Sequence, residues 1–390
     1  MNDKFLISDI KILSESGYKE LRGSMNGEIV YFRVPEEFDL YPIAECFLGL
    51  ALLDAMATNS TIVIDDAVSI SKELYDRFNE IQSIYSCWNE DLHTVNLEAR
   101  ISDVATPFDL TGSFFSAGVD SSHTLLRNQE DISHLIMFRA FDLGNDEESW
   151  KKRIEKQTQF ADSIGKVLVP VDTNVRDWTD SRNLSWAFVH GLFLSSVGGI
   201  FGMKRIYVPS SHTYAELFPW GSHPLSDPMW STESTEVIHD SAGFRRGAKM
   251  RDLLKEPLLA DNLQVCWGRT LDNCGECGKC TRTMVAIKLL GGETKSLPPL
   301  ANIKGLKFLK VTDESGASYL QDAMILARES GNDDAYRMLR RSYRRYQLGL
   351  IPRLLDQYLF ANFLRNLSRK INKPHWLHCV TLRSSKWGDY

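Results

Sequence analysis

Short apolar runs alternate with amphipathic stretches through the middle of the chain. Four runs have the length and the β-branched and aromatic content of buried parallel strands, namely residues 111–115, 134–141, 166–171 and 205–209. Between them, apolar positions recur at helical spacing in three stretches, residues 122–128, 147–165 and 186–201. Strands that alternate with helices across short links predict an α/β fold with a doubly wound parallel sheet. Such sheets bind ligands beyond the carboxyl ends of their strands.

The flanking segments have patterns of their own. Residues 1–104 contain two strand-like runs (29–34 and 61–64) and two helical ones (42–56 and 74–84), which predicts a small N-terminal α/β domain. Residues 301–390 predict a helical C-terminal region with an amphipathic helix at 318–329. Arginines in that region recur at steps of three and four residues and form a basic stripe, made of Arg337, Arg340, Arg341, Arg344 and Arg345. The stripe either faces solvent, pairs with the acidic remainder of the protein, or binds a nucleic-acid backbone.

Composition and charge narrow the class of protein. The chain has 390 residues, of which 43% are hydrophobic and 25% charged, as in ordinary soluble proteins of two or three domains. The net charge of −6 provides no overall basic field that would favour nucleic acid. The sequence has no apolar run long enough to span a bilayer, and its first residues lack the layout of a secretory signal. We therefore expect a cytoplasmic protein without membrane contact.

The first strand of the central region leads into a loop of small residues and then a helix. Small side chains at 116–118 let backbone N–H groups approach an anion, and the helix beginning near Ser121 directs its unpaired N–H groups to the same place. Serine hydroxyls in the loop add further donors. The carboxylate of Asp120 would repel a phosphate, but it fits if Mg²⁺ binds beside it. The loop therefore predicts a phosphate site, and the alternative is a serine-rich turn that caps an ordinary helix.

Four cysteines within fifteen positions form a second group of chemically active residues, made of Cys266, Cys274, Cys277 and Cys280. Four thiolates this close suit one tetrahedral Zn²⁺, and the spacing is also able to hold an iron–sulfur cluster. We favour zinc because the first thiolate lies upstream of the other three, beside a predicted strand end, as in a structural site. Because the four cysteines would occupy all four coordination positions of the metal ion, the metal is expected to be structural and not catalytic.

Ser116, Gly118, Asp120 and Ser121 resemble the SGGxDS signature of the PP-loop ATP pyrophosphatases, with Ala117 in place of the first glycine of that pattern. These enzymes cleave ATP between its α and β phosphates, so that AMP activates a substrate oxygen and pyrophosphate leaves. With the later pattern C-x₇-C-G-x-C-x₂-C-x-R, the chain is similar to the 7-cyano-7-deazaguanine synthases over about residues 108–291. That group uses ATP and ammonia to convert a carboxylate into an amide and then a nitrile.

The resemblance implies a HUP-type, Rossmann-like ATP-binding domain at residues 105–265 and a zinc segment at 266–300. It implies ATP, Mg²⁺ and Zn²⁺ as cofactors, a small carboxylate as the substrate and, from the group's dimers, a homodimer as a candidate assembly. The expected nucleotide-binding residues are Ser116, Ala117, Gly118, Val119, Asp120, Ser121, Ser122, Phe141, Asp142 and His212. The expected catalytic residues are Asp120, acting with Mg²⁺, and Arg246 and Lys249, which would neutralise the leaving pyrophosphate.

The expected substrate pocket departs from the synthase pattern. The group has a segment resembling Tyr-Pro-Asp-Cys-Arg, whereas residues 219–231 read PWGSHPLSDPMWS here. We therefore carry over the ATP chemistry but not the deazaguanine substrate, and we expect residues 214–255 to form a substrate-binding loop that leads into a helix. Three functions stay open: an AMP-forming C–N ligase, a sulfur-transferring or tRNA-modifying enzyme that uses Cys46, Cys87 or Cys379, and a non-catalytic nucleotide-binding module in a larger assembly.

Overall fold

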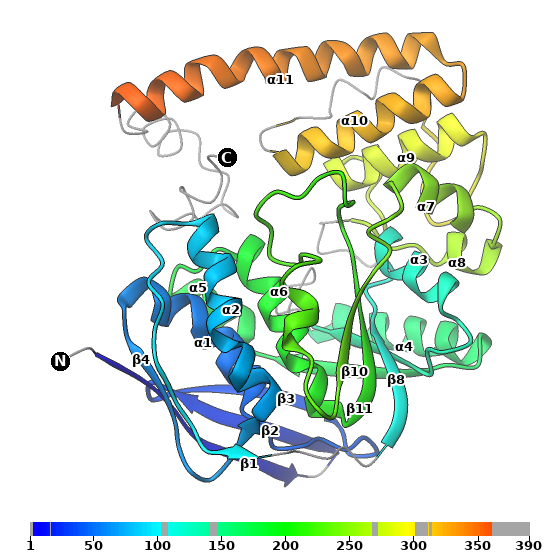
Figure 1. Ribbon diagram of the computed structural model, residues 1–390. Coiled ribbons are helices and arrows are strands. Elements are labelled where there is room, and N and C mark those ends of the chain that lie inside the picture. Colours follow the sequence, from blue (N-terminus) through cyan, green and yellow to red (C-terminus); the bar gives the residue numbers. More distant parts are fainter. Residues whose placement is uncertain are drawn as a thin grey trace.

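The computed structural model describes residues 3–360, except residues 16, 103–107, 140–146, 267–271, 301–310 and 312–313. Within them, Figure 1 shows a large sheet covered by helices. The sheet has ten strands in the order β12-β11-β8-β9-β10-β3-β2-β1-β4-β6, and most neighbouring strands in it are parallel. None of the helices in this described part is both long enough and apolar enough to span a membrane.

Five neighbouring strands run parallel and form the half of the sheet that carries the predicted ligand site. In spatial order they are β12 (Glu236–Asp240), β11 (Met203–Pro209), β8 (Phe108–Phe114), β9 (His134–Phe138) and β10 (Val167–Thr173). The chain enters this half at its centre through β8, adds β9 and β10 on one side, and then adds β11 and β12 on the other. The reversal creates a topological switch point between β8 and β11, where open α/β sheets bind ligands.

Helices cover both faces of this parallel half. Side chains of β9 alternate between two hydrophobic cores, because successive strand residues point to opposite faces. Ile136 and Phe138 belong to the core that contains α1 (Glu45–Thr58) and α6 (Trp186–Val197), and α6 continues as the 3₁₀ turn η1 (Gly198–Phe201). Leu135 and Met137 belong to the core that contains α3 (Val119–Arg127) and α4 (Glu147–Ser163). The predicted α/β architecture is thus confirmed, and the strand order is compatible with a Rossmann-like fold.

The N-terminal strands continue the same sheet. The meander of β1 (Lys4–Glu15), β2 (Tyr18–Met25) and β3 (Glu28–Pro35) is antiparallel, and β3 pairs antiparallel with β10. Next to β1 lie the parallel strands β4 (Thr61–Ile64) and β6 (Leu97–Glu98). The short strands β5 (Ile70–Ser71) and β7 (Ile101–Ser102) pair separately, and α2 (Lys72–Trp88) follows β5.

One hydrophobic core joins the N-terminal segment to the parallel half. Phe32 of β3 stacks on Phe193 of α6 with ring centroids 6.2 Å apart, and Phe193 contacts Phe138 of β9 at 4.8 Å. The predicted helix at residues 42–56 corresponds to α1, and nearly all residues of α1 are buried. The separate N-terminal domain at residues 1–104 stays a prediction. In the structure, most strands of this segment belong to the same sheet as the parallel half, and its buried apolar residues belong to the same core.

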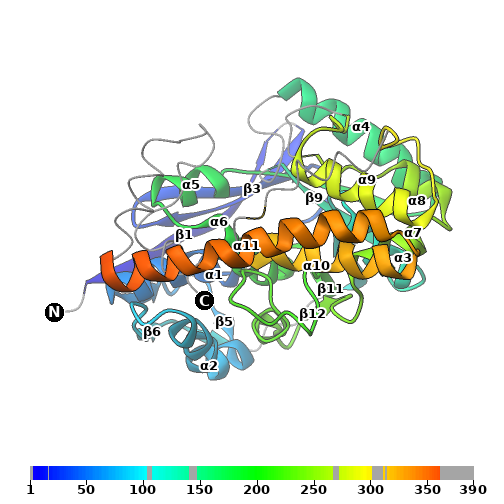
Figure 2. The ribbon, with the colours of Figure 1, turned by 90° about the horizontal axis from the view of Figure 1, so that it is seen from above.

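Helices also dominate the C-terminal third. In chain order they are α7 (Arg246–Leu253), α8 (Pro257–Asp261), α9 (Gly278–Leu290), α10 (Glu314–Glu329) and α11 (Asp333–Phe360). Apolar residues of α9, α10 and α11 form a third core. In Figure 1, α11 runs along α10 and continues past its end, and Figure 2 shows the same arrangement from above.

Several elements differ from the sequence-based prediction. Residues 214–255 contain the strand β12 and the 3₁₀ turn η2 (Asp227–Trp230), not only a loop and a helix. The strand escaped prediction because it is short, with two consecutive apolar residues, and pairing with β11 stabilises it. The pattern also identified β3 and β4 but not β1 and β2, and it missed the short helix α5 (Val175–Ser181).

Candidate functional site

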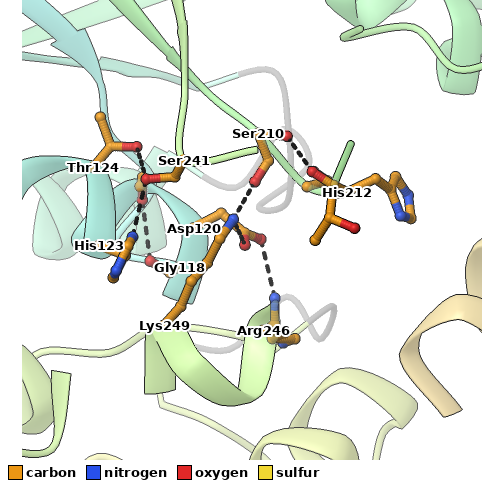
Figure 3. Close-up of polar contacts among 12 residues, drawn as sticks. Gly118, Asp120, His123, Thr124, Ser210, His212, Ser241, Arg246 and Lys249 are labelled. Atoms are coloured by element: carbon orange, nitrogen blue, oxygen red, sulfur yellow. Dashed lines mark hydrogen bonds and ion pairs between the residues drawn. The ribbon is translucent and has the colours of Figure 1, made fainter. Parts of the chain in front are cut away.

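The predicted phosphate loop lies at the switch point of the sheet. It follows β8, and the loop after β11, which contains Ser210 and His212, lies next to it (Figure 3). Gly118 is the N-cap residue of α3 and supplies no side-chain cap, so the first N–H groups of the helix depend on the loop or on a ligand. The position and polarity of this helix end suit an anion.

The loop backbone passes through a left-handed residue. Ala117 has φ of 56°, in the left-handed region where glycine is the usual residue. The Gln264 N–H donates to the carbonyl oxygen of Ala117 at 2.7 Å and holds this strained residue in place. A glycine in the corresponding position of the PP-loop pattern would adopt the same φ without strain. The loop therefore holds alanine in a conformation that glycine adopts more easily.

Serine side chains hold the loop closed on itself. The Ser121 hydroxyl donates to the Gly118 carbonyl oxygen at 3.2 Å and accepts from the Ser116 N–H at 3.2 Å. Ser116 is exposed, whereas the side chains of Val119 and Ser122 are buried. Val119 lies in the second hydrophobic core, so it offers a ligand its backbone N–H and not its side chain. Among the predicted loop residues, Ser116 and the backbone are thus the groups placed to meet an anion.

Asp120 brings two cations of α7 to the loop. Lys249 Nζ donates to Asp120 Oδ1 at 3.0 Å and to the Ser210 carbonyl oxygen at 2.6 Å, and Arg246 Nη1 donates to Asp120 Oδ2 at 3.0 Å (Figure 3). The Lys249 side chain is only 1% exposed. Burial would raise the pKa of Asp120, but the charges of Lys249 and Arg246 outweigh it and lower this pKa from 3.8 to about 2. Asp120 is therefore ionised at neutral pH.

A third cation increases the positive charge of the site. Arg282 of α9 is partly buried, and its guanidinium lies over the Tyr319 ring of α10, 3.9 Å from the centroid. Burial lowers the pKa of Arg282 to about 10, and its charge contributes to the low pKa of Asp120. Three cations thus surround one carboxylate in a partly desolvated space. Because an uncompensated buried charge is costly, this arrangement favours the binding of an anion.

His212 follows the carboxyl end of β11, as the sequence predicts. Its backbone lies beside Ser210, but its imidazole points away from Asp120 in Figure 3 and packs on aromatic rings, with the Trp220 centroid at 5.2 Å. Its Nε2 lies 3.2 Å from the Ser315 hydroxyl. Burial lowers the pKa of His212 to about 4, so the ring is neutral at pH 7. Its arrangement is that of a packed histidine, and its predicted contact with the nucleotide stays a prediction.

A buried polar network fixes α3 against the end of β12. His123 Nδ1 lies 2.9 Å from the Ser241 hydroxyl, and Thr124 donates to Asp240 Oδ2 at 2.9 Å. Ser241 has φ of 70°, and its hydroxyl donates to Asp240 at 2.6 Å. The side chains of this network are shielded from solvent, so we interpret it as support that orients the first turn of α3 and not as a catalytic triad.

The four predicted metal ligands lie together. All four sulfur atoms are within 4.8 Å of one another, with Cys274 to Cys280 at 4.0 Å and Cys266 to Cys277 at 3.9 Å. Zn–S bonds of about 2.3 Å in a tetrahedron place sulfurs about 3.8 Å apart, so the cluster fits Zn²⁺. The N–H groups of Glu276 and Cys277 donate to the Cys274 sulfur at 3.4 and 3.3 Å, and such hydrogen bonds favour the thiolate form.

A cavity of about 500 Å³ lies beside the loop and the metal segment. Gln264, which holds Ala117, lines it together with Lys156 of α4, Asn273 and Lys295. Among the described residues, the Gln264 Nε2 is buried without a hydrogen-bond acceptor. None of residues 116–122 lines this cavity, and the backbone hydrogen bond of Gln264 to Ala117 is its link to the loop.

Two predicted residues cannot be placed, and several placed residues were not predicted. Phe141 and Asp142 lie outside the described residues. The Ser210 carbonyl, Gln264 and Tyr319 had no assigned role in the sequence-based prediction, and Arg282 was identified only as part of the cysteine pattern. Only Arg282 had a sequence signal, because its distance from Cys280 is part of that pattern.

Comparisons with protein-family profiles, curated proteins and solved structures found no match for this chain.

Proposed function

We propose that this protein binds ATP at the loop of residues 116–122 and cleaves it to AMP and pyrophosphate. The AMP would activate a substrate carboxylate or carbonyl, and a nitrogen nucleophile would then form an amide or a nitrile, as in the synthases that the sequence resembles. The observation that carries this proposal is the loop and helix N-terminus at the switch point, next to Lys249, Arg246 and Arg282. A site with one anion among three cations is suited to phosphate.

Each group of the site would have a defined task. The loop N–H groups and the N-terminus of α3 would bind the β- and γ-phosphate oxygens. Lys249 and Arg246 would stabilise the charge that collects on pyrophosphate as the bond to the α-phosphate breaks. The Ser210 carbonyl keeps Lys249 in position, and Asp120 orients both cations before the nucleotide enters. A preorganised site of this kind needs little rearrangement during the reaction.

Mg²⁺ is proposed only as an ion that accompanies the triphosphate. Both Asp120 oxygens accept hydrogen bonds from cations, so a metal ion at Asp120 would have to displace Lys249 or Arg246. We derive no catalytic step from such an ion. Zinc at the four cysteines would stabilise the start of α9, and thereby the position of Arg282, without contacting the substrate.

The sulfur-transfer alternative is disfavoured by the other cysteines. Cys46 is fully buried in α1, and burial raises the pKa of its thiol, which makes it unreactive. Cys87 is exposed on α2, within the N-terminal segment, and Cys379 lies outside the described residues. Full activity of a variant with all three replaced by serine would exclude this route. The non-catalytic alternative would be favoured by ATP binding without cleavage.

Nucleotide binding and product analysis test the proposal. Calorimetry with α,β-methylene-ATP is expected to show binding, and Lys249→Met is expected to weaken it at least about tenfold, because a buried charge-assisted contact is lost. Lys255→Met is the matched control, since Lys255 is exposed and pairs with Asp252. Mass spectrometry of the products with candidate carboxylates is expected to give AMP and pyrophosphate. Absence of binding, or formation of ADP and phosphate, would refute the proposal.

A further inference from the structure

The outer face of α11 carries a single line of residues that the core does not use. Counting at about 100° per residue, the buried residues Ala335, Leu339 and Tyr346 lie on one side of the helix, and Ala335 and Leu339 belong to the core shared with α10. On the opposite side, six residues recur at alternating steps of four and three and fall within an arc of about 80°. We name them the α11 seam, which consists of Arg337, Arg341, Arg344, Leu348, Ile351 and Leu355.

The seam has a basic half and an apolar half. Arg337, Arg341 and Arg344 are exposed, and of these Arg337 pairs with Asp334, while the described part of the chain offers Arg341 and Arg344 no ion pair. The apolar half is unusually exposed for large side chains, with Leu348 at 68%, Ile351 at 58% and Leu355 at 52%. This half lies where α11 has passed the end of α10 (Figure 2). Large apolar side chains that are exposed side by side are typical of an interaction surface.

We propose that the α11 seam docks a helix of a partner protein whose facing positions are acidic along one half and apolar along the other. Steps of four and three residues are the spacing at which one helix packs along another, and the seam is about 27 Å long. Carboxylates would neutralise Arg337, Arg341 and Arg344, while apolar side chains would cover Leu348, Ile351 and Leu355. This proposal does not depend on the proposed ATP chemistry.

Other occupants fit the seam less well. A second copy of this chain would place arginine on arginine if parallel, and arginine on leucine if antiparallel. Residues 361–390 contain six Lys or Arg and one Asp, so this segment has the same sign of charge as the basic half. Nucleic acid would leave the apolar half without a partner. A membrane favours a wide apolar face, whereas this seam is narrow and half basic.

Designed helical peptides and a charge swap test the proposal with the full-length protein. The probes are fluorescent amphipathic helices with three Glu and three Leu at the facing positions, made in both sequence orders, together with versions in which Lys replaces Glu. In anisotropy titrations, at least one Glu peptide is expected to bind. The double variant Arg341→Glu/Arg344→Glu is expected to weaken that binding at least about tenfold and to gain binding of the matching Lys peptide. Arg100→Glu, an exposed arginine of the N-terminal segment, is the matched control.

Several outcomes would overturn this proposal. One is that neither Glu peptide binds. Another is that vesicles of phosphatidylserine and phosphatidylcholine, or duplex RNA, bind through Arg341 and Arg344 while the peptides do not. A third is that the protein is a dimer in light scattering and Leu355→Asn makes it a monomer, because a second copy then covers the seam. Gain of Lys-peptide binding by the charge-reversed variant is the result that a purely structural role of these arginines would not produce.

Discussion

Asp120 shows how single residues set the charge of the site. A carboxylate beside the proposed phosphate loop is unfavourable by itself, but here it holds Lys249 and Arg246 in one orientation. The low pKa of Asp120 measures how strongly the folded protein favours its ionised form. Because that pKa is about 2 when folded and near 3.8 when unfolded, the stabilisation is complete above the unfolded value and is lost as pH falls through about 2.

The variant Asp120→Asn is expected to be less stable than the wild type at neutral pH, because buried Lys249 loses its counter-charge. On acidification from about pH 5 to about pH 2, the free energy of unfolding is expected to fall by about 2 kcal/mol more for the wild type than for the variant. Urea unfolding across this range measures both effects. Asp76→Asn, which removes an exposed pair with Lys72, should leave the pH dependence unchanged. Equal pH dependence of Asp120→Asn and wild type would contradict this account.

At the scale of elements, the cysteine cluster lies at the start of α9. Cys277 is the N-cap residue of α9, and its sulfur accepts the Cys280 N–H at 3.5 Å. Arg282 follows Cys280 by two positions, so the same turn that gathers the thiolates also directs Arg282 toward Tyr319. A metal ion bound by these thiolates would therefore stabilise both the helix start and one cation of the site.

One zinc ion per chain is expected from metal analysis of the purified protein, and Cys277→Ser is expected to lose it. Hydrogen exchange in the first turn of α9 should become faster in that variant, because its cap is weakened. Cys87→Ser, which changes an exposed cysteine outside the cluster, should retain the metal. Iron and labile sulfide with visible absorption would instead identify an iron–sulfur cluster, and absence of any metal would refute the site.

At the scale of the whole molecule, the N-terminal segment and the parallel half are joined by backbone pairing and by close helix packing. β3 extends the sheet at β10, and α1 crosses α6 at Gly49. A Cβ on Gly49 would lie 2.3 Å from the Ser196 hydroxyl and 3.1 Å from the Leu192 carbonyl oxygen. This close approach leaves no room for a side chain, so glycine is required by packing and not by backbone conformation.

The variant Gly49→Ala is expected to destabilise the protein by about 1–3 kcal/mol or more, because the added methyl group forces α1 and α6 apart. Since the two parts share one core, hydrogen exchange should become faster in both β3 and β9. Gly243→Ala, where a Cβ would meet no atom within 4 Å, is the control and should leave stability unchanged. Faster exchange in the N-terminal segment alone would indicate that this segment unfolds independently.

The local patterns of the sequence were sufficient to predict the strands β8 to β11, the loop before α3 and the four clustered thiols. A buried parallel strand appears in the sequence as an apolar run, and the loop and the cysteine cluster are recognised from residues that are close together in the chain. The sequence also named Arg246 and Lys249 as candidate cations of the site, and the structure pairs both with Asp120. Their common partner, Asp120, was named from the loop alone.

What the tertiary structure decided lies in contacts between residues far apart in the chain. The pairing of β3 with β10, the strand β12, the stacking of Arg282 on Tyr319 and the orientation of the His212 ring depend on how elements pack, and periodicity carries no information about that. The low pKa of Asp120 also depends on tertiary structure, because the cations that lower it come from two helices, α7 and α9. Sequence thus determined which local elements form and which chemistry they carry, while burial and long-range packing decided which of those groups meet.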